Sequence, residues 1–386
     1  MDATVSRIKS LDILRGAAII GVITVHIMFG MGRGVDGNMY NFNFAELAYA
    51  ALPMFMVITG YLYKPGKDFM TNVKHRVVPL IVTLIVASIV LTCAMYVYMW
   101  LLGYDLGQYN LLNDVIEIIV GKGCFKDIGA SGFTAGHILA PYDISAGYYY
   151  LQILAVGLII FYAIADSVLD DWRECVLTIL SLMCVTGLYL TTVNVQLPFS
   201  AQLGPVVAAF LLTGALLKKY NVAEYIENRY REPKYWVIFA GMLVLSVLCI
   251  IFVPSGTNLY NSRFGDYGGL SVFPFLLLSI SCGIVLMYVV SFVMRIPVVS
   301  HIFAFAGVNS LVLFLLHMFV AKLIAAPFCT MGTDWWITVD SLPMRFALLI
   351  ITLAVVFAFI AFMNRTSKEI DDADVEDYVP TYSRLQ

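Results

Sequence analysis

The sequence predicts an all-α, polytopic membrane protein with about ten transmembrane helices, and three observations support this fold class. First, 61% of the 386 residues are hydrophobic and only 13% are charged, whereas about 25% of the residues of a typical soluble domain are charged. Second, the mean hydropathy is +0.86. Third, the apolar residues are gathered into segments of about 20 residues, the length that crosses a bilayer as a helix.

Charged residues between the apolar runs divide the chain into membrane-length segments. The first segment follows Arg7 and Lys9 and lacks a small-residue cleavage site, so we expect it to remain as a span. Residues 1–366 form the predicted transmembrane domain, and residues 367–386 form a polar, acidic tail. The predicted spans are 11–31, 44–63, 77–101, 148–165, 174–193, 201–217, 235–253, 270–292, 300–325 and 342–363.

The basic residues indicate how these spans are oriented. An even number of spans places both termini on the same side of the membrane. If the N-terminus is cytoplasmic, seventeen of the 23 Lys and Arg residues fall on the cytoplasmic side and six fall outside. Because short loops rich in Lys and Arg stay in the cytoplasm, we expect both termini to be cytoplasmic.

Two of the predicted loops differ from the others. The loop 64–76 is short, basic and cytoplasmic, whereas the loop 102–147 is long and external. Apolar residues within 111–119 have helical spacing, which predicts a helix at the outer surface. The seven cysteines show no metal-ligand spacing, so no metal site is predicted. The glycines are scattered and form no Gly-rich phosphate-binding loop.

The first span carries ionisable residues on one face. Arg15 and His26 are eleven residues apart, which at about 100° per residue places both on one face, about 16 Å apart, with Asp12 within roughly 60° of it. Ionisable groups inside a membrane helix are costly and mark candidate sites, and a neutral imidazole is suited to accept a proton. In the alternative interpretation, Arg15 signals topology and His26 is a hydrogen-bonded structural residue.

A second group of ionisable residues lies before the third span. Its members are Lys64, Lys67, Lys74, His75 and Arg76. They either hold the phosphates of a ligand at the cytoplasmic face or reflect the positive-inside bias alone. Arg76 lies at the membrane boundary, because the next span begins at Val77.

Polar residues also occur in the ninth and fourth predicted spans. Ser310 and His317 are seven residues apart and share a helix face, next to Asn309. Tyr150 belongs to a run of three tyrosines at the outer end of the fourth span. Polar residues that link helices inside a bundle and an aromatic belt at the membrane interface account for these positions equally well.

Several of these stretches resemble motifs of the acyltransferase-3 family, integral membrane enzymes that acylate carbohydrates. Leu11-Asp12-x-Leu14-Arg15-Gly16-x-Ala18 and His26 resemble the arginine and histidine that the family carries in its first span. The resemblance extends over most of the chain, with Pro-Met-Phe-Met-Val-Ile-Thr-Gly-Tyr-Leu at 53–62, Lys-His-Arg-Val-Val-Pro at 74–79, Tyr-Tyr-Tyr-Leu at 148–151, Gly-Val-Asn-Ser at 307–310 and Leu-Leu-His at 315–317.

The resemblance implies a membrane O-acyltransferase that moves an acyl group, with acetyl expected, from cytosolic acyl-CoA to a hydroxyl of an external glycan or glycolipid. It implies His26 as general base or transient acyl carrier. Arg15, Lys74 and Arg76 would bind acyl-CoA, with Arg15 as a second catalytic candidate that holds a CoA phosphate or polarises the donor carbonyl. At about 16 Å from His26, Arg15 is better placed to anchor the donor than to touch the reacting atom. The supporting residues would be Asp12, Tyr150, Asn309, Ser310 and His317.

The expected location is the bacterial cytoplasmic (inner) membrane. The expected partners are acyl-CoA as co-substrate, a carbohydrate or glycolipid acceptor of the cell envelope, such as a polysaccharide, and the bilayer. No metal and no nucleic acid is expected, and a homo-oligomer is left open. The competing interpretation is a transporter or exporter of a glycan or lipid-linked intermediate. Against it, the sequence shows no repeated half and no acidic residue in the middle of a span.

Overall fold

The computed structural model describes residues 9–28, 51–103, 149–192, 197–252, 272–325 and 342–371, and none of these residues forms a β-strand. The helices are α1 (Lys9–Met28), α3 (Ala51–Tyr61), α4 (Phe69–Asn72), α5 (Val78–Leu101), α7 (Tyr149–Val168), α8 (Trp172–Thr192), α9 (Gly204–Lys219), α10 (Val222–Arg229), α11 (Trp236–Phe252), α12 (Val272–Val293), α13 (Pro297–Val308), α14 (Ser310–Ala325) and α16 (Leu342–Asp371). Short π- and 3₁₀-helical turns cover Val73–Val77, Pro198–Leu203 and Pro233–Tyr235.

Within the described residues, eight helical segments are long and apolar enough to cross a membrane. They coincide with eight of the predicted spans, so the prediction of an all-α, multi-pass membrane protein is confirmed. The third predicted span, 77–101, starts earlier than predicted, because helical structure is continuous over Phe69–Leu101. The second predicted span, 44–63, corresponds to the short apolar helix α3, and its residues 44–50 lie outside the described residues, as does the helix predicted at 111–119.

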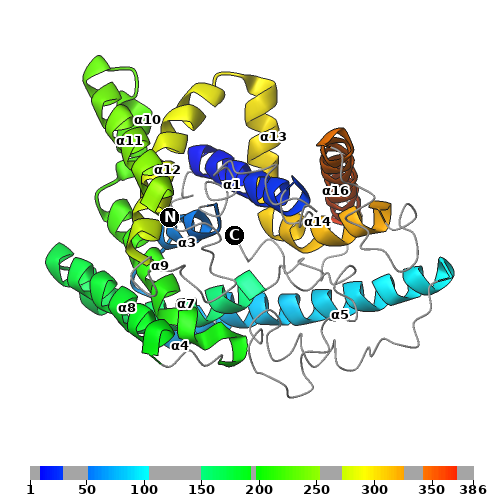
Figure 1. The fold of residues 1–386 in the computed structure, drawn as a ribbon, viewed down its shortest axis with the longest axis horizontal. Helices are drawn as coiled ribbons and strands as arrows, with labels where there is room; N and C mark the ends of the chain where they lie inside the picture. The colour runs from blue at the N-terminus through cyan, green and yellow to red at the C-terminus, as the bar shows by residue number, and fades with distance from the viewer. Residues whose placement is uncertain are drawn as a thin grey trace.

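The outer helices carry apolar side chains on their free faces. On α5, Val82, Val86 and Val90 recur every four residues and are all more than half exposed. A soluble surface rarely shows so continuous an apolar face, whereas a lipid-facing surface requires one. Figure 1 shows α5, α8 and α11 towards the edges of the assembly and α1 near its middle, with α3, α13 and α14 around it.

The ninth predicted span, 300–325, is not one continuous helix. It consists of α13 and α14, which are bent by 87° with respect to each other. The helix breaks at Asn309, which has φ −100° and ψ 21° and whose Nδ2 donates a hydrogen bond to the carbonyl of Phe305 at 2.8 Å. Asparagine favours such breaks because its side chain competes for backbone hydrogen bonds.

Glycines allow α1 and α13 to approach at backbone distance. A Cβ added at Gly16 would lie 1.9 Å from the carbonyl oxygen of Phe303, and one added at Gly307 would lie 1.8 Å from that of Asp12. Because membrane helices associate chiefly through close packing, small residues mark such interfaces. This contact places the bend at Asn309 next to the first turns of α1.

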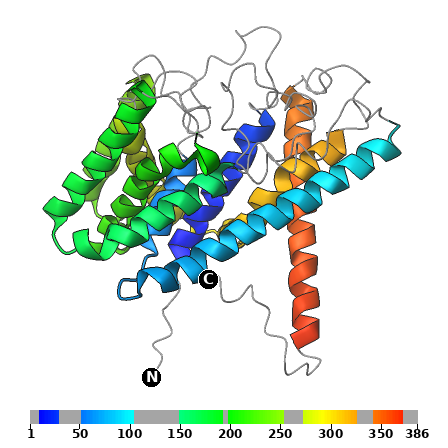
Figure 2. The ribbon, with the colours of Figure 1, turned by 90° about the horizontal axis from the view of Figure 1, so that it is seen from below.

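The two ends of the described chain lie on the same side of the bundle. Figure 2 shows the beginning of α1 and the end of α16 towards the same end of the molecule. An even number of membrane crossings produces this arrangement.

Candidate active site

A pair of histidines joins α1 to α14. Nδ1 of His26 lies 2.8 Å from Nε2 of His317, and the two rings are stacked with their centroids 5.1 Å apart. His317 is only 1% exposed. We refer to His26 and His317 as the histidine pair. The structure thus brings together two histidines that the sequence placed on separate helices.

The hydrogen bonds of the histidine pair define its protonation pattern. Nδ1 of His317 lies 3.0 Å from the carbonyl oxygen of Leu313. A carbonyl only accepts, so this nitrogen carries the proton, and Nε2 of a neutral His317 holds the lone pair. Nδ1–H of His26 therefore donates to His317, which leaves the lone pair of a neutral His26 on its Nε2. This is the atom that a general base requires.

Arg15 meets α14 at a second point. Its Nη2 donates a hydrogen bond to Oγ of Ser310 at 3.3 Å. Arg15 and Ser310 therefore form one contact between α1 and α14, and the histidine pair forms the other. The bend at Asn309 allows this, because it turns α14 away from the direction of α13 and along α1.

Aromatic rings form one wall beside the histidine pair. Tyr150, which is 5% exposed, lies between Phe55 and Phe314, with ring centroids 6.4 and 5.5 Å away. The ring of Phe314 is in turn 5.9 Å from His317. This wall, built from α3, α7 and α14, gives the histidine pair an apolar surrounding on this side.

Two other predicted site residues, Asn309 and Asp12, lie at the bend between α13 and α14 and at the contact between α1 and α13. The Asn309 side chain is bonded within α13, at the bend. Asp12 is half-buried one turn before Arg15, and its backbone carbonyl contacts Gly307.

Among the described residues, no group of three or more histidines, cysteines and carboxylates is arranged to hold a metal ion.

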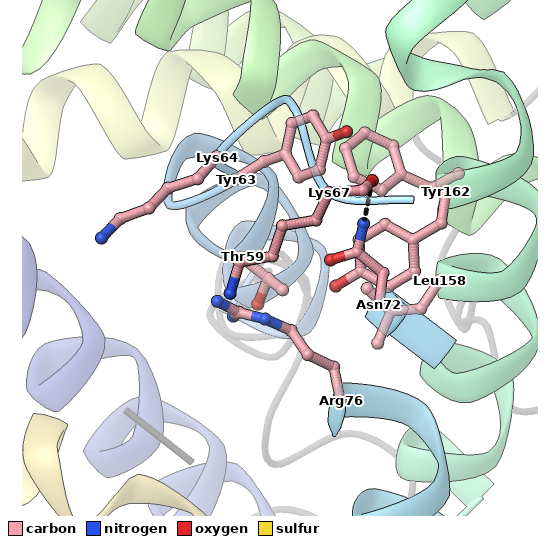
Figure 3. Close-up of a pocket in the computed structure, with 9 residues that line it drawn as sticks. Thr59, Tyr63, Lys64, Lys67, Asn72, Arg76, Leu158 and Tyr162 are labelled. Atoms are coloured by element: carbon pink, nitrogen blue, oxygen red, sulfur yellow. Dashed lines mark hydrogen bonds between the residues drawn. The ribbon is translucent and has the colours of Figure 1, made fainter. Parts of the chain in front are cut away.

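A pocket with three cationic side chains lies at the beginning of α5. Figure 3 shows the side chains of Lys67 and Arg76 ending close to Thr59, while Lys64 points outward. Nδ2 of Asn72 donates to the carbonyl of Lys67 at 3.0 Å and orders the loop. The other lining residues are Tyr63, Leu158, Phe161 and Tyr162. We call this site the cationic pocket.

The lining of the cationic pocket contains no carboxylate among the described residues. The nearby Asp166 accepts a hydrogen bond from the Tyr63 hydroxyl at 2.6 Å. Burial and this hydrogen bond raise the pKa of Tyr63, which therefore stays neutral. The positive charge of the pocket is thus available for an anionic ligand.

The cationic pocket includes only part of the predicted donor site. Arg76 lines it, whereas Lys74 is exposed and is not among its lining residues. The two residues are separated by two positions in a π-helical turn and cannot face the same way. The sequence placed Lys64 and Lys67 in the same basic cluster, but of this cluster only Lys74 and Arg76 were predicted to bind the donor.

Two helices, α3 and α7, contribute both to the cationic pocket and to the aromatic wall beside the histidine pair. Thr59 follows Phe55 by one turn on α3, and Leu158 follows Tyr150 by eight residues on α7. Eight helical residues span about 12 Å. A ligand with its phosphates in the cationic pocket could therefore extend along α3 and α7 towards the histidine pair.

These features define a multi-pass membrane protein with a hydrogen-bonded histidine pair between two helices and a separate cationic pocket. The model of the acyltransferase-3 family, described as an acyltransferase domain, matches residues 8–362. The match covers nearly the whole chain, so the chain belongs to this family of membrane acyltransferases. No curated protein and no solved structure gives a significant match.

Proposed function

We propose that the chain transfers an acyl group, specifically acetyl, from cytosolic acyl-CoA to a hydroxyl of a glycan or glycolipid at the outer face of a bacterial cytoplasmic membrane. The hydrogen-bonded histidine pair supports this proposal most strongly. It leaves a lone pair on Nε2 of His26, and a sugar hydroxyl must lose a proton to attack a thioester.

In this mechanism, Nε2 of His26 takes the proton as the acceptor oxygen bonds to the thioester carbonyl carbon. The carbon–sulfur bond then breaks, and the CoA thiolate takes the proton back from His26. His317 holds His26 in the tautomer that this step needs, and Nε2 of His317 stabilises the imidazolium through the hydrogen bond to Nδ1–H. In the variant with an acyl-histidine intermediate, the same Nε2 bonds to the thioester carbonyl carbon first and the carbon–sulfur bond breaks. The CoA thiolate then takes the proton of the sugar hydroxyl, whose oxygen accepts the acyl group as the bond to Nε2 breaks.

The charged residues bind the donor in this proposal. Lys64, Lys67 and Arg76 hold the nucleotide phosphates of acyl-CoA in the cationic pocket. The sequence predicts that Arg15 lies near the cytoplasmic end of α1 and that His26 lies deeper in the membrane. Arg15 therefore lies between the histidine pair and the cytoplasmic side, where the cationic pocket is expected. Its bond to Ser310 orients it, and a planar guanidinium is suited to a phosphate or to the donor carbonyl.

Replacement of His26 tests the proposal. Membrane vesicles with wild-type chain, His26→Ala or the control His301→Ala receive radiolabelled acetyl-CoA, and label in the glycan fraction is measured. His301 is a suitable control because it is exposed and bonded to its own helix at Pro297. We expect His26→Ala to reduce transfer by at least about 100-fold and His301→Ala to leave it unchanged. Full transfer by folded His26→Ala would refute both forms of the mechanism.

A further inference from the structure

Two arginines converge on one tyrosine at the end of the bundle that the sequence predicts to be cytoplasmic. Arg295 donates to Oη of Tyr230 from Nη2 at 2.6 Å and from Nε at 3.0 Å. Arg231 donates to the same oxygen from Nε at 3.4 Å. We call Arg231 and Arg295 the arginine pair. They come from the turns between α10 and α11 and between α12 and α13, so the fold brings two positive charges together around the hydroxyl of one tyrosine.

The arginine pair has no neutralising partner in the described part of the chain. Neither guanidinium is ion-paired with a carboxylate there, and the adjacent Glu232 binds Lys234 at 2.9 Å instead. A guanidinium has five N–H donors, of which Tyr230 engages two from Arg295 and one from Arg231. Both arginines are exposed, so the remaining donors can bind an anion.

The electrostatics at Tyr230 agree with this arrangement. Burial raises the pKa of its phenol, but Arg231 and Arg295 lower it, and the net shift is downward. The hydroxyl oxygen therefore lies in a positive field. An anion bound between the two guanidinium groups would neutralise this field.

The surroundings indicate which kind of anion fits. Trp236 begins α11 and Phe292 lies near the end of α12; each is 40% exposed, and their ring centroids are 5.8 Å apart. Aromatic residues at such positions lie at the level of lipid headgroups. Beyond Trp236, α11 exposes an apolar track that includes Val237 and Val244. A phosphate bound at the arginine pair would thus continue into chains that contact this track.

We infer that Arg231, Arg295 and Tyr230 bind the phosphate group of an anionic phospholipid in the cytoplasmic leaflet, with its chains along α11. The two guanidinium groups contact the phosphate oxygens, and Tyr230 holds the guanidinium groups in place. This site is separate from the histidine pair and the cationic pocket, and its occupancy does not depend on the acyl-transfer mechanism.

Native mass spectrometry of the purified full chain tests the inference. The delipidated protein is titrated with dioleoylphosphatidylglycerol or dioleoylphosphatidylcholine. We expect Arg231→Gln/Arg295→Gln to weaken binding of the most tightly bound phosphatidylglycerol by about thirtyfold. Arg173→Gln is the matched control, because Arg173 is also an exposed arginine beside an aromatic ring, Trp172, but has no second arginine on that ring. It should leave this binding unchanged.

Three results would overturn the inference: unchanged phosphatidylglycerol binding by the double variant, an equal loss for Arg173→Gln, or equal binding of phosphatidylcholine by the wild type. Inorganic phosphate forms a further arm; full displacement of the lipid at millimolar concentration would identify a free-phosphate site instead. If the double variant does not fold, Tyr230→Phe replaces it. This substitution removes only the hydroxyl that holds the arginine pair, and we expect about a threefold loss of phosphatidylglycerol affinity; no loss would count against the site.

Discussion

The histidine pair lies between α1 and α14 beside aromatic rings, whereas the three cations of the cationic pocket are exposed near the beginning of α5. Neutral imidazoles tolerate an apolar surrounding, but ammonium and guanidinium groups are costly to bury without partners. The fold therefore keeps the histidine pair apart from the cationic side chains. In the proposed mechanism, the first region would exclude water from the proton transfer, and the second would stay in contact with the aqueous phase that contains the phosphorylated donor.

Replacement of His317 should have the largest effect, and it should lower the turnover number without changing donor binding. His317→Ala leaves His26 in place but removes the acceptor of its Nδ1–H, so the tautomer is no longer fixed. We expect the turnover number to fall by about 100-fold and KM for acetyl-CoA to stay unchanged. Steady-state kinetics of the purified protein measure both. A change confined to KM would place His317 in donor binding instead.

Neutralising the cationic pocket should have the opposite signature. Lys64→Gln/Lys67→Gln/Arg76→Gln removes three exposed cations that together account for roughly 1–2 kcal/mol of phosphate binding. We therefore expect KM for acetyl-CoA to rise about tenfold with little change in turnover.

The control for the pocket is Lys74→Gln, since Lys74 comes from the same basic cluster but does not line the pocket. An equal rise in KM for this variant would show that general surface charge, rather than the pocket, attracts the donor. It would also support the sequence-based prediction that Lys74 binds acyl-CoA.

The sequence predicted parts of both regions but not their assembly. Helical periodicity placed Arg15 and His26 on one face of α1, and Ser310 and His317 on one face of α14. It could not show that these faces meet, because the contact depends on the bend at Asn309 and on glycine packing between α1 and α13. Both are tertiary properties.

The arrangement of the basic cluster was predicted less well, for a local reason. The sequence indicated a loop over 64–76, whereas helical structure begins at Phe69. In a loop, Lys74 and Arg76 can face the same ligand, but in a helical turn residues two positions apart point in different directions. Lys64 and Lys67 lie before this helix and can fold back towards Arg76.

The close approach of α1 and α13 can be broken selectively. The Cβ of Gly16→Ala would lie 1.9 Å from the carbonyl oxygen of Phe303, so backbone must move. We expect a loss of roughly 1–3 kcal/mol in the free energy of unfolding, measured by thermal unfolding in detergent. Gly241→Ala is the control, because no atom lies within 4 Å of its added Cβ. Equal stability of the two variants would contradict the packing account.

The smallest expected effect concerns Glu224, which binds Lys218 at 2.7 Å and accepts a hydrogen bond from Tyr61. Burial raises the pKa of Glu224, but these two hydrogen bonds lower it, and the net shift is downward. The ionised carboxylate therefore stabilises the fold above its unfolded pKa of about 4.3, and this contribution disappears as the pH falls through the lower folded value. The difference in Tm between wild type and Glu224→Gln should stay constant from pH 7 to about pH 5 and shrink from there to about pH 3. A difference that is constant over the whole of this range would contradict this assignment.

The central claim is that His26 and His317 act as one unit, and a double-mutant cycle on acetyl transfer tests it most directly. Residues that act together give strongly non-additive losses. If the claim is correct, His26→Ala/His317→Ala is no slower than His26→Ala alone, because His317 acts only through His26. If the losses of the two single variants multiply in the double variant, His317 acts independently and the claim is wrong.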